Sequence, residues 1–157
     1  MKLVLAFVAL AVSAFGIVQE AAPPKFDPKR DAAKDIKEAI AVAKKQNKRV
    51  MLDVGGEWCG WCKKLDEFFL TNKEAAKILK ERYIVVKVNF SPENKNEAVL
   101  SKYPPIKGYP HLFVLDKNGK LLHSQDTGEL ETGDHHDAAK VIPFLKKWAG
   151  TKSPQRG

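Results

Sequence analysis

Two kinds of hydrophobic pattern along the chain predict alternating helices and strands. Apolar residues recur every three or four positions in the helical segments, and near-continuous apolar runs mark buried strands. The expected helices are 29–47, 59–70, 73–82 and 137–148, with a short helix within 93–102, and the expected strands are 50–54, 83–90, 111–116 and 120–124. Asn118-Gly119 between the last two strands is a strong hairpin signal. The strand–helix–strand order predicts that 50–54 and 83–90 pair in parallel, which indicates an α/β fold.

The N-terminus has the pattern of a secretory signal peptide. Met1-Lys2 is followed by an apolar run from Leu3 to Val12 and then by small residues, so cleavage is expected after Ala14 or Gly16. The run is shorter than the roughly 20 residues that a membrane helix needs. We therefore expect a periplasmic or secreted protein. The expected segments are a signal peptide at 1–16, a linker without a fold of its own at 17–28, one domain at 29–150 and a flexible tail at 151–157.

Composition changes this picture little. The 157 residues are 44% hydrophobic and 29% charged, as in an ordinary globular domain. The net charge of +8 raises the question of nucleic acid or membrane binding. However, Asp31 and Asp35 open the first predicted helix and Lys44 and Lys45 close it, which is the polarity that a helix dipole favours. We interpret the charge as solvated helix faces and expect no nucleic-acid partner.

Two cysteines in Trp58-Cys59-Gly60-Trp61-Cys62 lie at a strand-to-helix junction. At this spacing their Cβ atoms are about 5 to 6 Å apart, close enough for a disulfide after modest adjustment. Cys59 is expected at or next to the helix N-cap, where free N–H groups and the dipole lower a thiol pKa. Cys62, one turn later on the apolar face, is expected to be more buried. These positions predict that Cys59 attacks a substrate disulfide and Cys62 resolves the mixed disulfide.

Two other roles for the cysteines compete with exchange chemistry. A purely structural disulfide would close a very small loop and add little stability. A zinc site needs two further ligands, and the four histidines, His111, His123, His135 and His136, have no second paired spacing. We interpret His135-His136 as a polar entry to the last helix. We therefore expect no metal and no cofactor apart from the redox-active disulfide.

Asp53 and Lys87 interrupt two apolar strands that are expected to be neighbours. One interpretation is that both side chains point to solvent. The other is that they form a pair and that burial beneath Cys62 raises the pKa of Asp53, which then accepts and returns the Cys62 proton. The pattern alone leaves both interpretations open.

Four motifs occur in order along the chain. They are Asp53 six residues before Cys59, Trp58-Cys59-Gly60-x-Cys62-Lys63, Val-x-Lys87-Val-Asn89, and Gly108-x-Pro110 before a hairpin. Together they resemble the thioredoxin family, and in detail the exported thioredoxin-like proteins related to the C-terminal domain of transmembrane thiol-disulfide interchange reductases. The resemblance extends from about Val50 to Trp148. It implies a thioredoxin-like fold with a central mixed sheet of about four strands flanked by helices.

The resemblance also implies roles for individual residues. Pro110 would be cis and lie against the disulfide, and Tyr109 would offer its backbone to an extended substrate peptide. Trp58, Gly60 and Trp61 would complete the substrate-binding surface, and Asp53 and Lys87 would act with the two cysteines. The chain departs from the family in three places: Trp61 replaces a proline, Val54-Gly55-Gly56 lacks a bulky aromatic residue, and the first strand usual in thioredoxin is not evident before the helix that Asp31 opens.

The resulting prediction is an exported thiol-disulfide oxidoreductase that acts as a monomeric protein-disulfide reductase. Its partners would be protein disulfide substrates and a membrane thiol-disulfide electron donor. Strongly oxidising relatives have a histidine between the cysteines, and this chain has none. The alternatives are a disulfide oxidase or isomerase on the same fold, and a chaperone-like peptide-binding module with an incidental dithiol.

Overall fold

The computed structural model describes residues 25–150. The predicted signal peptide at 1–16, the first part of the predicted linker and the predicted tail at 151–157 lie outside the described residues. Within the described part, no helix is both long enough and apolar enough to cross a membrane.

The elements follow the predicted order closely. The helices are α1 (Ala32–Gln46), α2 (Gly60–Thr71), α3 (Lys73–Arg82), α4 (Glu97–Leu100) and α5 (Ala138–Trp148), with the 3-10 helix η1 (Thr127–Leu130). The strands are β1 (Arg49–Gly55), β2 (Tyr83–Asn89), β3 (His111–Leu115), β4 (Leu121–Asp126), β5 (Glu131–Thr132) and β6 (His135–His136). Side-chain caps explain where three helices begin, because Asp31, Asn72 and Asp137 each accept a backbone N–H of the following turn.

The main sheet has the strand order β2-β1-β3-β4, with β1 and β2 parallel and the other pairs antiparallel. The predicted mixed four-stranded sheet and the parallel pair are therefore confirmed. The β3–β4 hairpin turns at Asn118-Gly119, where Gly119 has a φ of 88° that a glycine adopts without strain.

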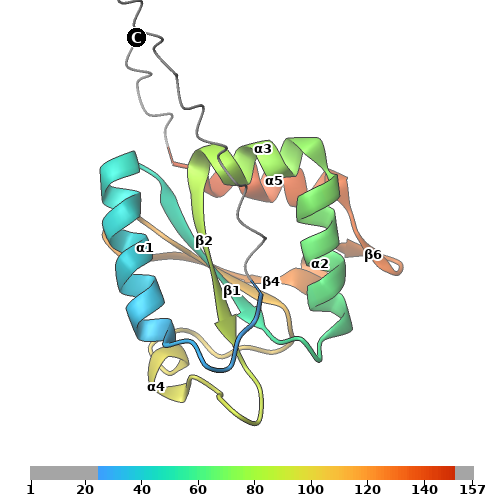
Figure 1. Cartoon of the computed structure of the whole chain (residues 1–157). Coiled ribbons are helices and arrows are strands. Elements are labelled where there is room, and N and C mark those ends of the chain that lie inside the picture. The colour runs from blue at the N-terminus through green and yellow to red at the C-terminus, as the bar shows by residue number, and fades with distance from the viewer. Residues whose placement is uncertain (1–24, 151–157) are drawn as a thin grey trace, which may run out of the picture.

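Alternate residues of β1 belong to two cores on opposite faces of the sheet. Val50, Leu52 and Val54 pack with α1, whereas Met51 packs with residues of α2, α3 and α5. Figure 1 shows α1 apart from these three helices, on the other side of the sheet. Asp53 shares the face of Met51 because strand side chains alternate. The apolar pattern therefore places a carboxyl group on the α2 side.

The structure corrects three details of the prediction. The helix expected within 93–102 is reduced to the single turn of α4. His135-His136 does not enter the last helix but forms strand β6, which pairs with β5. Phe26, in the segment predicted to be a linker without a fold of its own, is 3% exposed. Asn96 has a φ of 48°, outside the right-handed helical range, so a helix does not continue through it. Contacts with distant residues explain the other two differences, because His136 packs on Trp61 and Phe26 donates its backbone N–H to Glu57.

Candidate active site

The two cysteines form a disulfide at the N-terminus of α2, with their Cα atoms 5.2 Å apart. Cys59 is the N-cap residue, and its Sγ accepts the backbone N–H of Cys62 at 3.1 Å. Cys59 is 4% exposed and Cys62 1%, so both are buried in the disulfide form and the expected contrast in exposure is small. Their contrast lies in position, because only Cys59 caps the free N–H groups of the helix.

Asp53 and Lys87 face each other across the parallel strands β1 and β2. The Lys87 Nζ donates to Asp53 Oδ2 at 2.6 Å and also to Asp66 on α2. The side chains of Asp53 and Lys87 are only 1% and 6% exposed. The interpretation in which both point to solvent is therefore wrong, and the carboxylate of Asp66 joins the pair from the helix.

Burial determines how these groups bind protons. Burial raises the pKa of Asp53, although Lys87 opposes the shift. Burial also disfavours the charged form of Lys87, but the carboxylates of Asp53 and Asp66 outweigh it and raise the pKa of Lys87. Lys87 therefore stays protonated, and Asp53 is the member of the cluster suited to gain and lose a proton. Asp53 Oδ1 has no hydrogen-bond partner in the described part of the chain, so it is available for that exchange.

Gly55 brings Cys62 close to the sheet. A Cβ atom at Gly55 would lie 2.5 Å from Cys62 Sγ, so no side chain fits at this position. Asp53 precedes Gly55 by two residues on the same face of β1, which corresponds to about 6.5 to 7 Å along the strand. The carboxyl group and the Cys62 sulfur are therefore neighbours on one face of the sheet.

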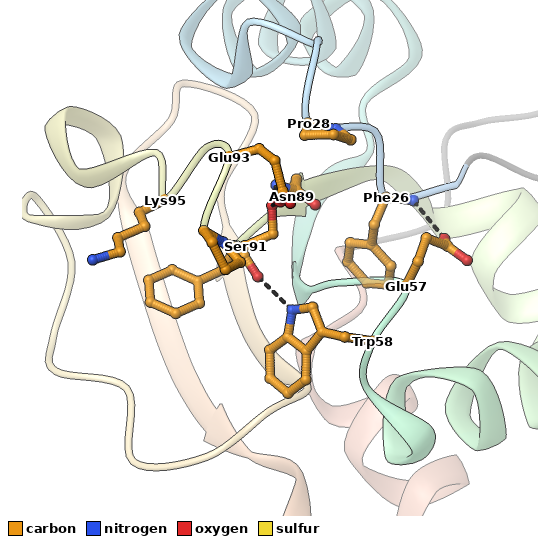
Figure 2. A pocket seen from close by; sticks show the side chains of 10 residues that line it. Phe26, Pro28, Glu57, Trp58, Asn89, Ser91, Glu93 and Lys95 are labelled. Atoms are coloured by element: carbon orange, nitrogen blue, oxygen red, sulfur yellow. Dashed lines mark hydrogen bonds between the residues drawn. The ribbon is translucent and has the colours of Figure 1, made fainter.

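Aromatic side chains surround the disulfide on the Tyr109 side. The Tyr109–Pro110 peptide bond is cis. Tyr109 stacks on Phe90, with ring centroids 4.8 Å apart, and meets the edge of Trp58 at 5.7 Å. Trp58 remains 56% exposed, and its Nε1–H donates to the Phe90 carbonyl at 2.7 Å (Figure 2). These contacts hold a broad apolar surface next to Cys59.

A cavity of about 630 Å³ opens beside Trp58 (Figure 2). Apolar and polar side chains both line it. They are Phe26, Pro28, Glu57, Trp58, Asn89, Phe90, Ser91, Pro92, Glu93 and Lys95. Sequence reasoning missed Phe26 and Phe90 as site residues. Phe26 could have been suspected only because it is the one aromatic residue in a proline-rich segment.

The β5–β6 hairpin covers Trp61 from the opposite side. His136 is 4% exposed, meets the Trp61 ring edge-on at 5.4 Å, and has its Nε2 3.4 Å from the Trp61 carbonyl oxygen. Lys64 Nζ lies 4.5 Å from the Trp61 ring centroid and donates to the Asp134 carbonyl of the hairpin. At Gly60, by contrast, a Cβ would meet no other part of residues 25–150 within 4 Å beyond its chain neighbours and its own helix backbone, so the turn between the cysteines is open there.

Several predicted site residues thus lie near one disulfide. Trp61 and Tyr109 pack against the cluster that contains both cysteines, Trp58 contacts Tyr109, and Asp53 and Lys87 pair on the neighbouring strands. Residues 25–150 contain no cluster of three or more histidine, cysteine or acidic side chains that could hold a metal ion. A buried dithiol pair with an adjacent carboxyl group can exchange with another disulfide and manage the proton of the second thiol.

The sequence is similar to those of known thiol-disulfide oxidoreductases. A family model described as thioredoxin-like matches residues 31–117. The chain is 32% identical over 87 residues to the thiol:disulfide interchange protein DsbD of Actinobacillus pleuropneumoniae, a match that covers 55% of this chain and 15% of that protein. It is 29% identical over 94 residues to the disulfide bond reductase DsbH of Chlamydia pneumoniae, covering 54% of this chain and 56% of that protein.

Solved structures give the same picture for the fold. The crystal structure of a disulphide isomerase from Xylella fastidiosa matches with a TM-score of 0.69 at 25% identity, covering 81% of this chain and 98% of that one. The C-terminal domain of DsbD from Neisseria meningitidis, in its oxidised form, matches with a TM-score of 0.55 at 24% identity, covering 75% and 96%.

Proposed function

Since the chain belongs to the thioredoxin-like family and carries the cysteine pair of a thiol-disulfide oxidoreductase, we propose that it is an exported protein-disulfide reductase. The observation that carries the proposal is the buried Asp53–Lys87 pair beside a disulfide whose first cysteine caps a helix. A purely structural disulfide needs neither a helix N-cap nor a buried proton acceptor.

The reaction begins with the reduced pair, Cys59 as thiolate and Cys62 as thiol. The Cys59 sulfur attacks a substrate disulfide, a Cys59–substrate disulfide forms, and the first substrate sulfur leaves as a thiolate that takes a proton from solvent. Cys62 then gives its proton to Asp53, and its sulfur attacks Cys59 Sγ. The Cys59–Cys62 disulfide forms and the second substrate thiolate leaves, taking up a proton. The substrate gains two electrons from the cysteine pair and two protons, one from solvent and one to balance the proton that Cys62 gave to Asp53.

The substrate in this proposal is an extended polypeptide that lies across the cis-proline loop. In this proposal the backbone of Tyr109 would pair with the peptide, as in the addition of a short strand, and Pro110, Gly60 and Trp61 would border the reacting sulfurs. Trp58 contacts Tyr109 and also lines the cavity of about 630 Å³, which would hold a side chain next to the substrate cysteine.

The direction of transfer and the location rest on the relatives and on the N-terminal pattern. One relative is named as a disulfide bond reductase and another as a thiol:disulfide interchange protein. By analogy, a membrane thiol-disulfide donor would return the cysteine pair to the dithiol state in the periplasm or outside the cell. In this proposal the active protein is a monomer.

The test is the equilibrium potential of the Cys59–Cys62 couple in a glutathione buffer, together with turnover of a disulfide-bonded model peptide. A reductase requires a potential well below the roughly −120 mV of a strong periplasmic oxidant and closer to the roughly −270 mV of thioredoxin. Cys59→Ser should abolish turnover. A potential near that of the oxidant would reverse the direction, and peptide binding without any turnover in the wild type would favour the chaperone-like module.

A second candidate, a disulfide isomerase, is favoured by the similarity to the Xylella fastidiosa structure. Refolding of a model protein with scrambled disulfides separates the two activities. A catalytic amount of a reduced isomerase restores the native disulfides of the model protein. A reductase instead leaves the model protein with free thiols and is itself oxidised in equal amount.

A further inference from the structure

A strap formed by residues 25–28 runs beside the active site before α1 begins. It contains no helix or strand, yet Phe26 within it is 3% exposed. The backbone N–H of Phe26 donates to Glu57 Oε1 at 3.1 Å, a contact between residues 31 positions apart (Figure 2). Glu57 therefore attaches the strap to the turn that carries Trp58 and Cys59.

The ring of Phe26 contacts the reactive centre directly. It packs in one apolar cluster with Cys59 and Cys62. Its centroid lies 4.4 Å from Lys87 Nζ, and its Cζ would be 3.1 Å from a Cβ at Gly55. The ring therefore fills the space that the side-chain-free Gly55 leaves beside Cys62, and it lies against the Lys87 Nζ that holds Asp53.

Alternate residues of the strap face different cavities. Phe26 and Pro28 line the cavity beside Trp58, where we place the substrate. Lys25 and Asp27 line a second cavity, which is also lined by Lys87. The strap therefore lies between two cavities. One is the cavity beside Trp58, where we place the substrate, and the other is the cavity lined by Lys87.

Removing the Phe26 ring would open the pair to the substrate cavity. Water that entered there would solvate the ionised carboxyl group of Asp53, whose Oδ1 now has no partner in the described residues. Water would also weaken the attraction between Asp53 and Lys87, because charges interact less strongly at high dielectric. Burial is the largest influence on the pKa of Asp53, so solvation of its carboxylate by the entering water should outweigh the weaker attraction to Lys87.

We propose that Phe26, held by Glu57, is a positioning residue that excludes water from Asp53 on the substrate side and thereby sets the pH range in which Cys62 loses its proton. The proposal rests on the exchange function proposed above, and Phe26 acts through Asp53. The ionisable groups around Asp53 are Lys87 on β2 and Asp66 and Cys62 on α2, and those around Lys87 in the second cavity are Lys25, Asp27, Arg30, Asp35 and Glu38.

The experiment follows the Asp53 carboxyl carbon by ¹³C NMR as the full-length protein is titrated from pH 4 to 9. In Phe26→Ala, the midpoint should move about one pH unit downward from its wild-type value, because a solvated carboxyl group ionises more easily. The pH profile for resolution of a Cys59–peptide mixed disulfide should move in the same direction and by a similar amount. Phe26→Leu should restore most of the wild-type midpoint because it restores apolar bulk.

Three further variants separate the proposed role from a general loss of packing. Phe144→Ala removes another nearly buried phenylalanine, 6% exposed on α5, and should leave the Asp53 midpoint unchanged. Glu57→Ala removes the acceptor for the strap but keeps the ring, and should move the midpoint partway. Glu57→Gln keeps an acceptor and should leave the Asp53 midpoint at its wild-type value. The Glu57 pair keeps the test informative if Phe26→Ala does not fold.

The NMR midpoint does not depend on any substrate, so the two proposals can fail separately. An inactive wild type with the predicted midpoint shifts would overturn the reductase assignment alone. An active Phe26→Ala and an active Glu57→Ala, both with the wild-type midpoint, would show that Phe26 does not control water access to Asp53.

Discussion

Cys59 and Cys62 differ at the level of single residues in what surrounds each sulfur. Cys59 caps α2 and receives a backbone N–H at 3.1 Å, whereas Cys62 lies one turn inside the helix against Gly55. A helix N-terminus stabilises a thiolate, and an apolar contact does not. Reactivity should therefore be unequal even though both sulfurs are buried in the disulfide form.

Limiting iodoacetamide should label Cys59 first in the reduced protein at mildly acidic pH. We expect a preference of roughly tenfold over Cys62, since each unit of thiol pKa changes the thiolate fraction tenfold. Peptide mapping by mass spectrometry measures the ratio. The same protein unfolded in urea provides the control, where the two cysteines should react alike. Equal labelling of the folded protein would remove the N-cap explanation.

Asp53→Asn should slow the resolving step while leaving the fold intact. Asparagine keeps the shape of the side chain but cannot take the Cys62 proton, so we expect a loss of about 10² near neutral pH, at the low end for a general base. Stopped-flow release of peptide from a Cys59 mixed disulfide measures the rate. Glu67→Gln, which removes an exposed carboxylate on the same helix as Cys62, is the matched control. An unchanged rate in Asp53→Asn would mean that water alone accepts the proton.

At the scale of elements, the β5–β6 hairpin determines the surroundings of Trp61. The hairpin brings His136 to a residue 75 positions earlier in the chain and accepts a hydrogen bond from Lys64 at Asp134. His136 Nδ1 is buried without a hydrogen-bond partner in the described part of the chain. Burial therefore lowers the pKa of His136, and the neutral ring is the form that fits.

The free energy of unfolding should decrease as the pH falls below about 6.5, the ordinary value for histidine. The unfolded chain binds a proton at His136 in that range and the folded chain does not, so acid favours unfolding. His136→Gln should reduce this pH dependence, whereas His135→Gln, at an exposed neighbour on the same strand, should not. Urea denaturation at pH 5 and pH 7 tests both variants. His111 on β3, whose pKa burial also lowers, should supply part of the slope that remains.

At the scale of the whole molecule, the disulfide contributes little to the two cores. The larger cores on either face of the sheet contain neither cysteine, and the disulfide joins residues only three positions apart. The fold should therefore tolerate the opening and closing of this bond, which an exchange enzyme requires in every turnover.

Reduction should lower the free energy of unfolding by about 2 kcal/mol or less, the chain-entropy value for so short a loop. Urea denaturation with and without a reductant measures the difference, and the Cys59→Ser/Cys62→Ser variant should match the reduced protein. A much larger loss on reduction would mean that the disulfide supports the fold itself and would argue against a redox role.

Local signals in the sequence account for most of the fold and, in the site, for the cysteine pair at the start of a helix. Helix caps and apolar periods act over a few residues, so the positions of α3 and the β3–β4 hairpin could be predicted closely. The N-cap position of Cys59 follows from the same local rules. Opposite charges at Asp53 and Lys87 on two apolar strands suggested a pair, but the sequence left their direction open.

Tertiary structure alone decided what surrounds these groups. The ring of Phe26 reaches the disulfide from a segment outside any helix or strand, Asp66 joins Lys87 from α2, and His136 reaches Trp61 from a hairpin that has only two residues in each strand. No period or spacing encodes such contacts, because they join short segments far apart in the chain whose positions are set by the packing of the elements between them. The sequence therefore determined which residues carry the sulfur chemistry, and the packing determined how much water they meet.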